Sequence, residues 1–404
     1  MVVKKIDSYI IFYFFSIDKG SKIWKINTID SQLSTTTIML SFPIKLAFCI
    51  TELNIGGAER AICELAVRLD KTRFSVIVYS LQSPPNCESK SCVPILEAAE
   101  IPVRFLNMQG LQSFPAGFFR LRKLLKEQQP AIFLSYLFHA NFLGRLAAYS
   151  VGIKHIFSGI RVAEKKAVWH LLLDRWTNQW VEKNICVSNS VAEFTETVGR
   201  LAKEKIVVIP NGIDVIPIDK AWEKKSNRVI FIGRLTYQKG LDWFLETTPD
   251  WLEQLPDWEC WIVGDGEDYN RLINILRSQY YDLVRNRIRF LGWRSDILEL
   301  LVTSNILVLP SRWEGMPNVV LQAMGVGLPI VATEVEGVSE LLGENKTNQT
   351  CRFGDHKTMA ERILTLATNS SLAGYLGNQN REQVQKFFSM DAVVRCYEEL
   401  FIPK

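Results

Sequence analysis

The sequence predicts an α/β protein with two domains, each built on a doubly wound parallel sheet. From residue 44 onward, short apolar runs bounded by Gly and Pro alternate with amphipathic runs, which is typical of parallel strands joined by helices. The polar stretch 219–227 divides this alternation into two series with the same plan and is the best candidate for a linker. A chain of 404 residues also exceeds what one ordinary core holds, so two domains are expected.

The first domain is predicted over 44–205. Strands are expected where apolar residues run without interruption, at 44–50, 74–80, 103–106, 131–137, 155–160 and 185–188. Helices are expected between them, where apolar positions recur every three or four residues, at 58–69, 93–99, 118–128, 141–150, 169–184 and 190–197.

The second domain is predicted over 206–385. It begins with a strand from 206 that runs into a turn, and further strands are expected at 229–232, 259–263, 288–291, 306–309 and 329–332. Helices are expected at 241–253, 269–278 and 296–303, and one begins near Pro317, where a missing backbone N–H costs nothing.

Residues 1–43 are expected to be an N-terminal extension. The apolar run 9–15 is far shorter than the roughly 20 residues that span a bilayer, and no small-residue cleavage site follows it. Met39 stands directly before the first clear strand. We therefore expect 1–38 to be an upstream translation artefact or a disordered tail.

The composition is that of a globular protein, with 48% hydrophobic and 22% charged residues. Eight cysteines are scattered without a CxxC pair, which indicates reduced thiols in the cytoplasm and argues against a zinc site. Residues 44–205 carry 21 Lys and Arg against 14 Asp and Glu, whereas 206–404 carry 21 against 26. The basic half suits an anionic partner, such as a membrane surface or a phosphorylated lipid acceptor, unless it is only a solvated surface. No basic–aromatic array recurs, so nucleic acid is not expected.

The stretch 304–333 is the best candidate for the chemistry. It predicts a buried strand, a sharp loop that contains Glu314, a helix and a second buried strand. Glu314 then lies at the carboxyl end of a strand and just before a helix N-terminus, where open α/β sheets bind anionic ligands. The alternative is an ordinary loop whose Glu caps its own helix.

Two cations are predicted at the same sheet edge. Arg234 and Lys239 follow the strand that ends at Gly233. If this loop and the Glu314 loop face one crevice, cations and amides suit a diphosphate and the carboxylate suits hydroxyl groups. The ligand so described is a nucleotide diphosphate that carries a polyhydroxylated group. A surface ion pair is the alternative for the two cations.

Backbone near the other strand ends is expected to line the same ligand. Gly264 and Gly266 follow one strand, and Leu291 and Trp293 flank the turn after the next, where a flat base can rest on exposed backbone. In the first domain, Gly56 and Gly57 at a strand-to-helix turn also allow close approach of a ligand.

The sequence resembles family 4 of the retaining glycosyltransferases, which have the GT-B fold, over about residues 44–400. The matching motifs are specific and in the family's order: 56–60 (GGAER), 208–214 (VIPNGID), Gly233-Arg-Leu, Lys239-Gly240, 263–266 (VGDG), 290–292 (FLG), 310–317 (PSRWEGMP), 325–332 (GVGLPIVA) and 337–340 (GVSE). The resemblance implies two Rossmann-like domains that face each other across a cleft, with the acceptor on 44–205 and the nucleotide sugar on 206–385. It also implies that 386–404 is a helix that crosses back to the first domain.

The resemblance assigns roles by position. Arg234 and Lys239 would hold the donor diphosphate, and Glu314 would bind sugar hydroxyl groups. Amides just beyond Glu314 would cover the sugar and phosphates, and the candidates are Gly315, Met316, Asn318 and Val319. Where the family has a second Glu that contacts the ribose, this chain has Gln322. This difference should weaken donor binding by about tenfold without abolishing activity.

A second difference concerns the strand 131–137. Many members of the family carry a His at its carboxyl end, whereas here it ends Leu134-Ser-Tyr136 and the nearest histidine is His139. Either Tyr136 occupies that position or His139 takes over the role, and His139 can equally be a helix-start residue without chemistry.

The resemblance implies a metal-independent, retaining transfer of a hexose-type sugar from a nucleotide-diphosphate sugar to a glycan or lipid-linked acceptor, in cell-envelope or exopolysaccharide synthesis. No cofactor is expected. The protein is expected in the cytoplasm, at the inner face of the membrane. No Asp-x-Asp pair suggests a metal, and Arg234 and Lys239 would stabilise the leaving phosphate. The alternatives are a non-catalytic sugar-nucleotide binder and a nucleotide-sugar epimerase.

Overall fold

The computed structural model describes residues 43–163, 168–214, 226–279 and 286–402, together with four strands before residue 43. The chain divides into two compact units. Unit 1 comprises Met1–Gly159, Leu172–Asn184 and Val394–Lys404, and unit 2 comprises Ile160–Leu171 and Ile185–Val393. Most of the predicted linker 219–227 lies outside the described residues.

The first large sheet has seven strands in the order β11-β10-β9-β8-β5-β6-β7. Their bounds are β5 (Ile44–Ile50), β6 (Phe74–Ser80), β7 (Val103–Phe105), β8 (Ile132–Tyr136), β9 (His155–Ile160), β10 (Lys183–Cys186) and β11 (Ile206–Val208). The pairs β5–β6, β5–β8, β6–β7 and β8–β9 are parallel. From β5 the chain adds strands on one side and from β8 on the other, so the order reverses between these two strands.

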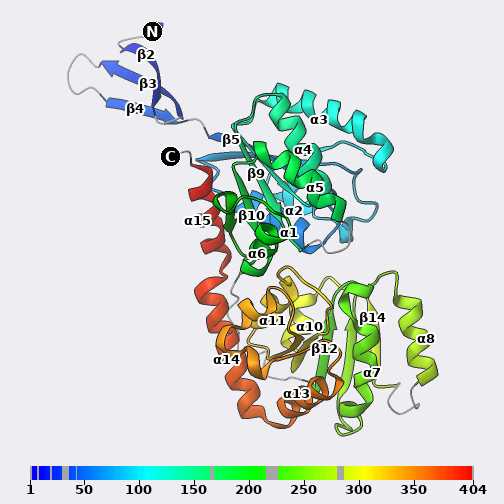
Figure 1. Cartoon of the computed structure of the whole chain (residues 1–404). Helices are drawn as coiled ribbons and strands as arrows, with labels where there is room; N and C mark the ends of the chain where they lie inside the picture. Colours follow the sequence, from blue (N-terminus) through cyan, green and yellow to red (C-terminus); the bar gives the residue numbers. More distant parts are fainter. Residues whose placement is uncertain are drawn as a thin grey trace. The chain divides into compact units, whose positions relative to one another are not determined.

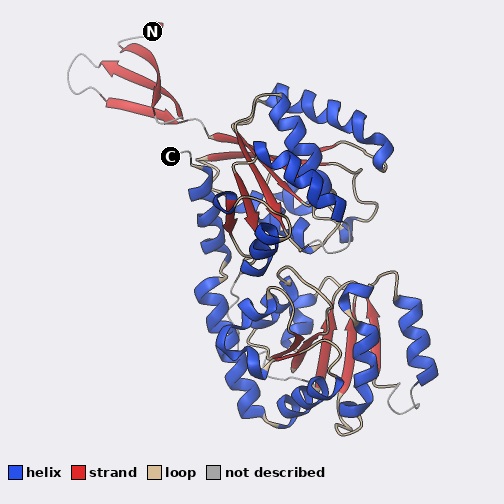
Figure 2. Cartoon of the chain, viewed as in Figure 1, coloured by secondary structure: helices blue, strands red, loops and turns tan. Residues whose placement is uncertain are grey.

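Helices connect the strands of this sheet and cover its faces (Figures 1 and 2). They are α1 (Gly57–Arg68), α2 (Val93–Ala98), α3 (Phe114–Gln128), α4 (Phe138–Ser150), α5 (Val168–Thr177) and α6 (Asn189–Thr197). The last helix of the chain, α15 (Met390–Phe401), returns its second half to unit 1. There Phe401 packs against Phe48, Phe74 and Phe157, and it is only 1% exposed.

The second large sheet has six parallel strands in the order β14-β13-β12-β15-β16-β17. Their bounds are β12 (Arg228–Ile232), β13 (Glu259–Val263), β14 (Ile288–Gly292), β15 (Ile306–Leu309), β16 (Ile330–Thr333) and β17 (Thr350–Cys351). The helices are α7 (Leu241–Leu252), α8 (Tyr269–Gln279), α10 (Ile297–Val302), α11 (Asn318–Gly325), α12 (Val338–Leu342), α13 (His356–Thr368) and α14 (Ser370–Phe387). Here the order reverses between β12 and β15.

Side chains alternate between two separate cores in unit 2. Val229 and Phe231 of β12 point into a cluster that also holds Trp251 of α7, while Ile230 of the same strand points into a cluster with Leu321 of α11. Because successive residues of a strand face opposite sides, a sheet covered on both faces needs the uninterrupted apolar runs that the sequence has. The predicted α/β, doubly wound class is therefore confirmed in both sheets.

Three segments compare with the sequence-based expectations as follows. The strand from 206, predicted to begin the second domain, is β11 and lies at the edge of the first sheet. The segment before residue 43, predicted to be a translation artefact or a disordered tail, contains β1 (Val2–Ile6), β2 (Tyr9–Asp18), β3 (Ser21–Ile29) and β4 (Thr36–Ser41), paired antiparallel in that order. Its β-branched and aromatic residues favour such pairing. The helix predicted over 169–184 ends at Thr177, a short 3-10 turn follows, and β10 already begins at Lys183.

In the part of the chain that the structure describes, no helix has both the length and the apolar character needed to cross a bilayer.

Candidate functional site

The residues predicted to hold the donor follow the two strands at which the sheet order of unit 2 reverses. Arg234 and Lys239 lie after β12, and Glu314 lies after β15, which pairs directly with β12. Because both strands are parallel, their carboxyl ends meet at one edge. A reversal of strand order leaves a crevice there, and open α/β sheets bind their ligands at such points.

The two loops touch through their charged side chains. Lys239 Nζ lies 2.5 Å from Glu314 Oε1, and the Ser311 hydroxyl donates to the same oxygen at 2.7 Å. The Lys239 and Glu314 side chains are 14% and 8% exposed. Among the described residues both bonds go to Oε1, which leaves Oε2 of Glu314 for a ligand. Lys239 also keeps N–H groups to donate, because an ammonium has three.

Arg234 differs from Lys239 in its surroundings. Its side chain is exposed, and no ion pair of the guanidinium occurs within the described ranges. A guanidinium matches the oxygens of a phosphate in two parallel hydrogen bonds. Arg234 thus presents a cation at the strand end while Lys239 is paired with the carboxylate.

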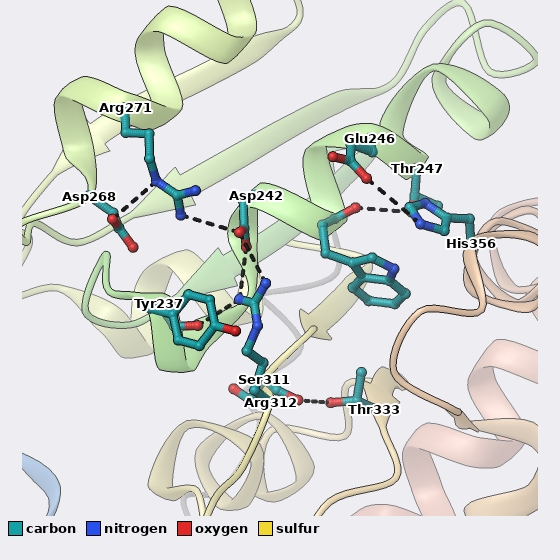
Figure 3. A network of polar contacts seen from close by, with 11 residues as sticks. Tyr237, Asp242, Glu246, Thr247, Asp268, Arg271, Ser311, Arg312, Thr333 and His356 are labelled. Atoms are coloured by element: carbon teal, nitrogen blue, oxygen red, sulfur yellow. Dashed lines mark hydrogen bonds and ion pairs between the residues drawn. The ribbon is translucent and has the colours of Figure 1, made fainter. Parts of the chain in front are cut away.

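Arg312 fastens the two loops to each other (Figure 3). Its backbone N–H donates to the Gln238 carbonyl at 2.8 Å, and its guanidinium donates to the Tyr237 carbonyl at 2.6 Å. The guanidinium also stacks over the Tyr237 ring at 3.9 Å from the centroid. In return, Gln238 Nε2 donates to the Trp313 carbonyl at 2.9 Å. These bonds fix the backbone on both sides of the Lys239–Glu314 contact.

Asp242, in the first turn of α7, anchors the Arg312 guanidinium in a two-pronged ion pair. The N–O distances are 2.9 and 3.0 Å, and both side chains are 15% exposed. Arg271 reaches the same carboxylate at 3.2 Å, as Figure 3 shows. Burial alone would raise the pKa of Asp242, but the hydrogen bonds from Arg312, the Trp243 backbone and Arg271 together hold it below its ordinary value.

Helix α11 begins next to Glu314. Its N-terminus has no side-chain cap in the described structure, and its dipole favours a negative charge there. The predicted amides of Gly315, Met316, Asn318 and Val319 all belong to this turn, and Gln322 is half-buried one turn further along α11.

Asn211 holds the entrance to α11 in place. Its Nδ2 donates to the Met316 carbonyl at 3.2 Å and to Asn318 Oδ1 at 2.6 Å, while its own Oδ1 accepts from Arg161. A side chain at Gly315 would collide with the Arg161 carbonyl, since an added Cβ would lie 1.9 Å from that oxygen. Glycine at 315 is therefore required by the packing of this loop, whatever ligand it covers.

The glycines predicted to line the base pocket fall into two kinds. Gly264 and Gly266 have φ of 134° and 159°, and a Cβ there would lie 1.9 Å and 2.3 Å from the carbonyl oxygens of Gly233 and Leu235. These two glycines allow neighbouring loops to interlock. Gly292 has φ of 67° with nothing within 4 Å of an added Cβ. Of the three glycines, Gly292 is the one with open space beside its backbone, and it lies between the half-buried Leu291 and Trp293.

The remaining predicted residues belong to unit 1. Gly56 and Gly57 begin α1 after β5, and His139 is the exposed second residue of α4 after β8. These positions follow the two strands at which the order of the first sheet reverses. Gly56, Gly57 and His139 thus lie in unit 1, whereas the predicted donor residues lie in unit 2.

Tyr136 does not occupy an open position at the end of β8. Its hydroxyl lies 2.5 Å from that of Tyr397 on α15, and the side chain is 1% exposed. Its ring also fills the space above Gly159, where a Cβ would approach it to 2.4 Å. The alternative in which Tyr136 faces the reacting sugar is therefore wrong for this structure, because the ring points into the core of unit 1.

The residues that support the site are not evident from the sequence. Arg312 and Asp242 were not predicted, although Arg312 lies two residues before Glu314 and Asp242 lies three residues after Lys239. In the sequence, an acidic residue in the first turn of a predicted helix cannot be told from an ordinary helix start. Only the fold shows that it pairs with a residue 70 positions away.

Family models match both halves of the chain. Residues 55–216 match the model described as Glycosyltransferase Family 4, and residues 226–369 match the one described as Glycosyl transferases group 1.

Two curated relatives align over nearly their whole length. The chain is 29% identical to the UDP-Gal:alpha-D-GlcNAc-diphosphoundecaprenol alpha-1,3-galactosyltransferase of Escherichia coli, over 89% of this chain and 97% of the relative. It is 26% identical to an alpha-1,4-N-acetyl-D-galactosaminyltransferase of Campylobacter jejuni that acts on a diNAcBac-PP-undecaprenol glycan, over 85% and 94%.

Solved structures share the architecture. The chain resembles HepE of Anabaena in complex with UDP, with a TM-score of 0.76 at 20% identity over 88% of this chain and 99% of that one. The same protein in complex with UDP-glucose gives a TM-score of 0.76 at 19% identity. The architecture is thus the GT-B fold, and with its two halves matched by the Glycosyltransferase Family 4 and Glycosyl transferases group 1 models, the chain belongs to the family 4 glycosyltransferases.

Proposed function

We propose that this glycosyltransferase transfers a hexose-type sugar from a uridine-diphosphate sugar to a glycan carried on a lipid diphosphate. The single observation that carries the proposal is the meeting of Lys239 and Glu314 at 2.5 Å beside the N-terminus of α11. Cation, carboxylate and helix N-terminus together match a diphosphate that bears a sugar.

The donor and acceptor classes rest on the relatives. Crystal structures of HepE contain UDP or UDP-glucose, and the Escherichia coli and Campylobacter jejuni enzymes are named for transfer to undecaprenol-diphosphate glycans. Galactose and N-acetylgalactosamine, the sugars in those names, are both of the hexose type. The same names support a role in envelope polysaccharide synthesis and an acceptor presented at a membrane.

The proposed mechanism retains the anomeric configuration and uses the protein's own cations. Arg234 and Lys239 stabilise the charge that grows on the departing diphosphate, and α11 adds its dipole. Glu314 is held by Lys239 and Ser311, an arrangement that suits binding of sugar hydroxyl groups through Oε2 rather than nucleophilic attack. The acceptor hydroxyl then attacks the anomeric carbon on the face that the diphosphate leaves. The bond from that carbon to the diphosphate breaks, the departing phosphate oxygen takes the hydroxyl proton, and no metal is required.

The test is transfer of isotope-labelled sugar from a panel of UDP-sugars to a short-chain lipid-diphosphate glycan, with and without EDTA. Nuclear magnetic resonance of the product gives the anomeric configuration. The Glu314→Ala variant should still fold and should lose at least about 100-fold in turnover, and its melting temperature should fall because Lys239 is left buried without its partner. Full turnover in this variant would refute the assignment of Glu314.

The chain contains one observation that favours a non-catalytic binder, namely Gln322 in place of a second Glu. Binding of UDP-sugars without turnover on any acceptor would support that alternative. Interconversion of the sugar without an acceptor would support an epimerase.

A further inference from the structure

Helix α5 presents an apolar face to solvent. Trp169, Leu172 and Trp176 recur at spacings of three and four, so they lie on one side of the helix, and they are 51%, 59% and 54% exposed. Single exposed apolar residues are ordinary, but three large ones in a row on one helix face form a patch that needs an explanation.

The patch continues onto α4 through stacked rings. Trp176 packs edge-on against Trp180 at 5.7 Å between centroids, and Trp180 stacks on Tyr149 of α4 at 4.6 Å. Tyr149 is itself 55% exposed. We call the exposed members that belong to unit 1, Tyr149, Leu172 and Trp176, the aromatic ridge; Trp169, at the start of α5, falls in the segment Ile160–Leu171 of unit 2. The ring contacts hold Trp176 and Tyr149 in place, so their exposure is a property of the fold.

Helix α3 adds positive charge beside the ridge. It packs on α4, and Phe142 of α4 contacts both Phe114 at the start of α3, at 5.4 Å, and Trp176, at 6.3 Å. The three helices therefore lie next to one another on unit 1, as Figure 1 shows.

One side of α3 is basic and faces solvent. Phe119, Arg122, Lys123 and Lys126 follow the helical spacing of three and four, opposite the buried Leu121 and Leu125. Phe119 is 64% exposed and the Lys123 side chain 78%. Arg122, Lys123 and Lys126 are the basic face. Residues 108–159 contain six Lys and Arg and a single acidic residue, Glu127, which pairs with Lys123 at 3.9 Å, so the stretch keeps a clear excess of positive charge.

We propose that the aromatic ridge and the basic face together form the surface by which unit 1 docks on an anionic lipid bilayer. This inference rests on the proposed function in one respect only, that the acceptor is carried on a lipid. Trp and Tyr concentrate at membrane–water interfaces, and Lys and Arg next to them bind anionic headgroups. A second copy of the chain fits less well, because a symmetric contact through this surface would bring the basic faces of both copies together.

The test is flotation of the purified full chain with vesicles of phosphatidylcholine alone and of phosphatidylcholine mixed with phosphatidylglycerol. The wild type should bind the mixed vesicles more tightly, and salt should weaken that binding. Leu172→Ser with Trp176→Ser should weaken it at least about tenfold, because less apolar surface enters the interface. Changing the three residues of the basic face to Gln should weaken it about 100-fold on mixed vesicles, at about fivefold for each charge.

The matched control is Tyr375→Ser with Phe387→Ser, which removes two equally exposed aromatic residues (57% and 48%) from α14 of unit 2. It should bind as the wild type does. Circular dichroism of every variant checks the fold. Unchanged vesicle binding in the ridge variant would overturn the proposal, as would equal binding of the wild type to both vesicle types. Loss of a dimer in the ridge variant, without vesicle binding by the wild type, would assign the ridge to a second copy instead.

The two proposals fail separately. If the docking surface is correct, the ridge variant should still transfer sugar to a water-soluble short-chain acceptor at the wild-type rate. A wild type that binds vesicles but transfers no sugar would refute the proposed function and leave the docking surface standing. A wild type that transfers sugar but does not bind vesicles would refute the docking surface and leave the proposed function standing.

Discussion

At the scale of single residues, the candidate site is a small set of charges held by a larger set of supporting bonds. Lys239 and Glu314 are already paired when no ligand is bound, so a diphosphate shares the lysine with the carboxylate. Such pairing lowers the cost of burying either charge alone. It also means that changing one partner leaves the other buried and unpaired.

We therefore expect Lys239→Ala and Lys239→Arg to separate two effects on UDP binding: the loss of the positive charge and the change in where that charge lies. The Ala variant should bind UDP about tenfold more weakly or worse, because a charge-assisted hydrogen bond to phosphate is lost. The Arg variant keeps the charge and should recover part of that affinity. Isothermal titration with UDP measures both, with Lys357→Ala on the exposed start of α13 as the control. Wild-type affinity in the Ala variant would remove Lys239 from the phosphate site.

Gln322 gives a second test at this scale, one that aims to gain affinity. A carboxylate on a ribose diol makes a stronger hydrogen bond than an amide, so Gln322→Glu should tighten UDP binding by about tenfold. Gln322→Ala should weaken it. Titration with UDP and with uracil separates a contact to the ribose from one to the base. Equal UDP affinity in all three proteins would place the ribose elsewhere.

The Asp242–Arg312 pair supports the loops without touching the proposed ligand, so it should act on stability first. Asp242→Asn and Arg312→Gln in a double-mutant cycle should show a coupling of about 1–2 kcal/mol in the free energy of unfolding. The folded pKa of Asp242 lies below its ordinary value of 3.8, so its contribution is complete above that pH and is lost as the pH falls below it. Urea titrations from neutral pH down to about 3 should show a smaller acid loss in Asp242→Asn than in the wild type. Additive single changes would mean that the pair is not coupled.

At the scale of elements, the sequence predicted most of what periodicity and apolar runs can show. The runs at 44–50, 259–263 and 306–309 match β5, β13 and β15 residue for residue. The end of the helix after residue 168 was wrong, because Glu182 and Lys183 resemble the solvated face of a continuing helix. The strand there is fixed by contacts far along the chain, such as the bond from the Glu182 N–H to the Ile156 carbonyl at 2.8 Å.

The same limit applies to the site. The sequence predicted Glu314, Arg234 and Lys239 as site residues because a charge that follows an apolar strand is unusual in itself. It did not identify Arg312, whose role depends on a partner 70 residues away, or the direction of Tyr136, which depends on α15. Local pattern shows where a strand ends, but it does not show which distant residue a side chain meets there.

The hydroxyl pair of Tyr136 and Tyr397 joins β8 to α15, so it predicts how these two elements depend on each other. Tyr136→Phe alone should cost about 1 kcal/mol, because the hydrogen bond between the two buried hydroxyl groups is lost. Adding Tyr397→Phe should cost little more, since both buried polar groups are then gone. Urea unfolding of the three variants measures this. Two independent, additive costs would show that the hydroxyl groups are satisfied by other partners.

At the scale of the whole molecule, unit 1 is assembled from three separate stretches of chain. The last of them, Val394–Lys404, supplies Phe401 to a ring cluster of Phe48, Phe74 and Phe157. Glu398 adds an ion pair to Arg73 at 3.1 Å and accepts from the Asp70 N–H at 2.9 Å. The end of the chain therefore completes a core that the first half cannot fill alone.

Phe401→Ala should accordingly destabilise unit 1 by about 3–5 kcal/mol, the usual cost of removing a buried aromatic ring. Because the donor residues lie in unit 2, the affinity of the folded variant for UDP should stay within about twofold of the wild type. Scanning calorimetry with and without UDP tests both points, since a ligand raises the melting temperature of the unit that binds it. Phe401→Leu is the control and should cost much less, because it keeps most of the buried volume. A Phe401→Ala protein that melts as the wild type does would show that α15 is not needed to complete unit 1, and a large loss of UDP affinity would show that the two units are not independent in binding the donor.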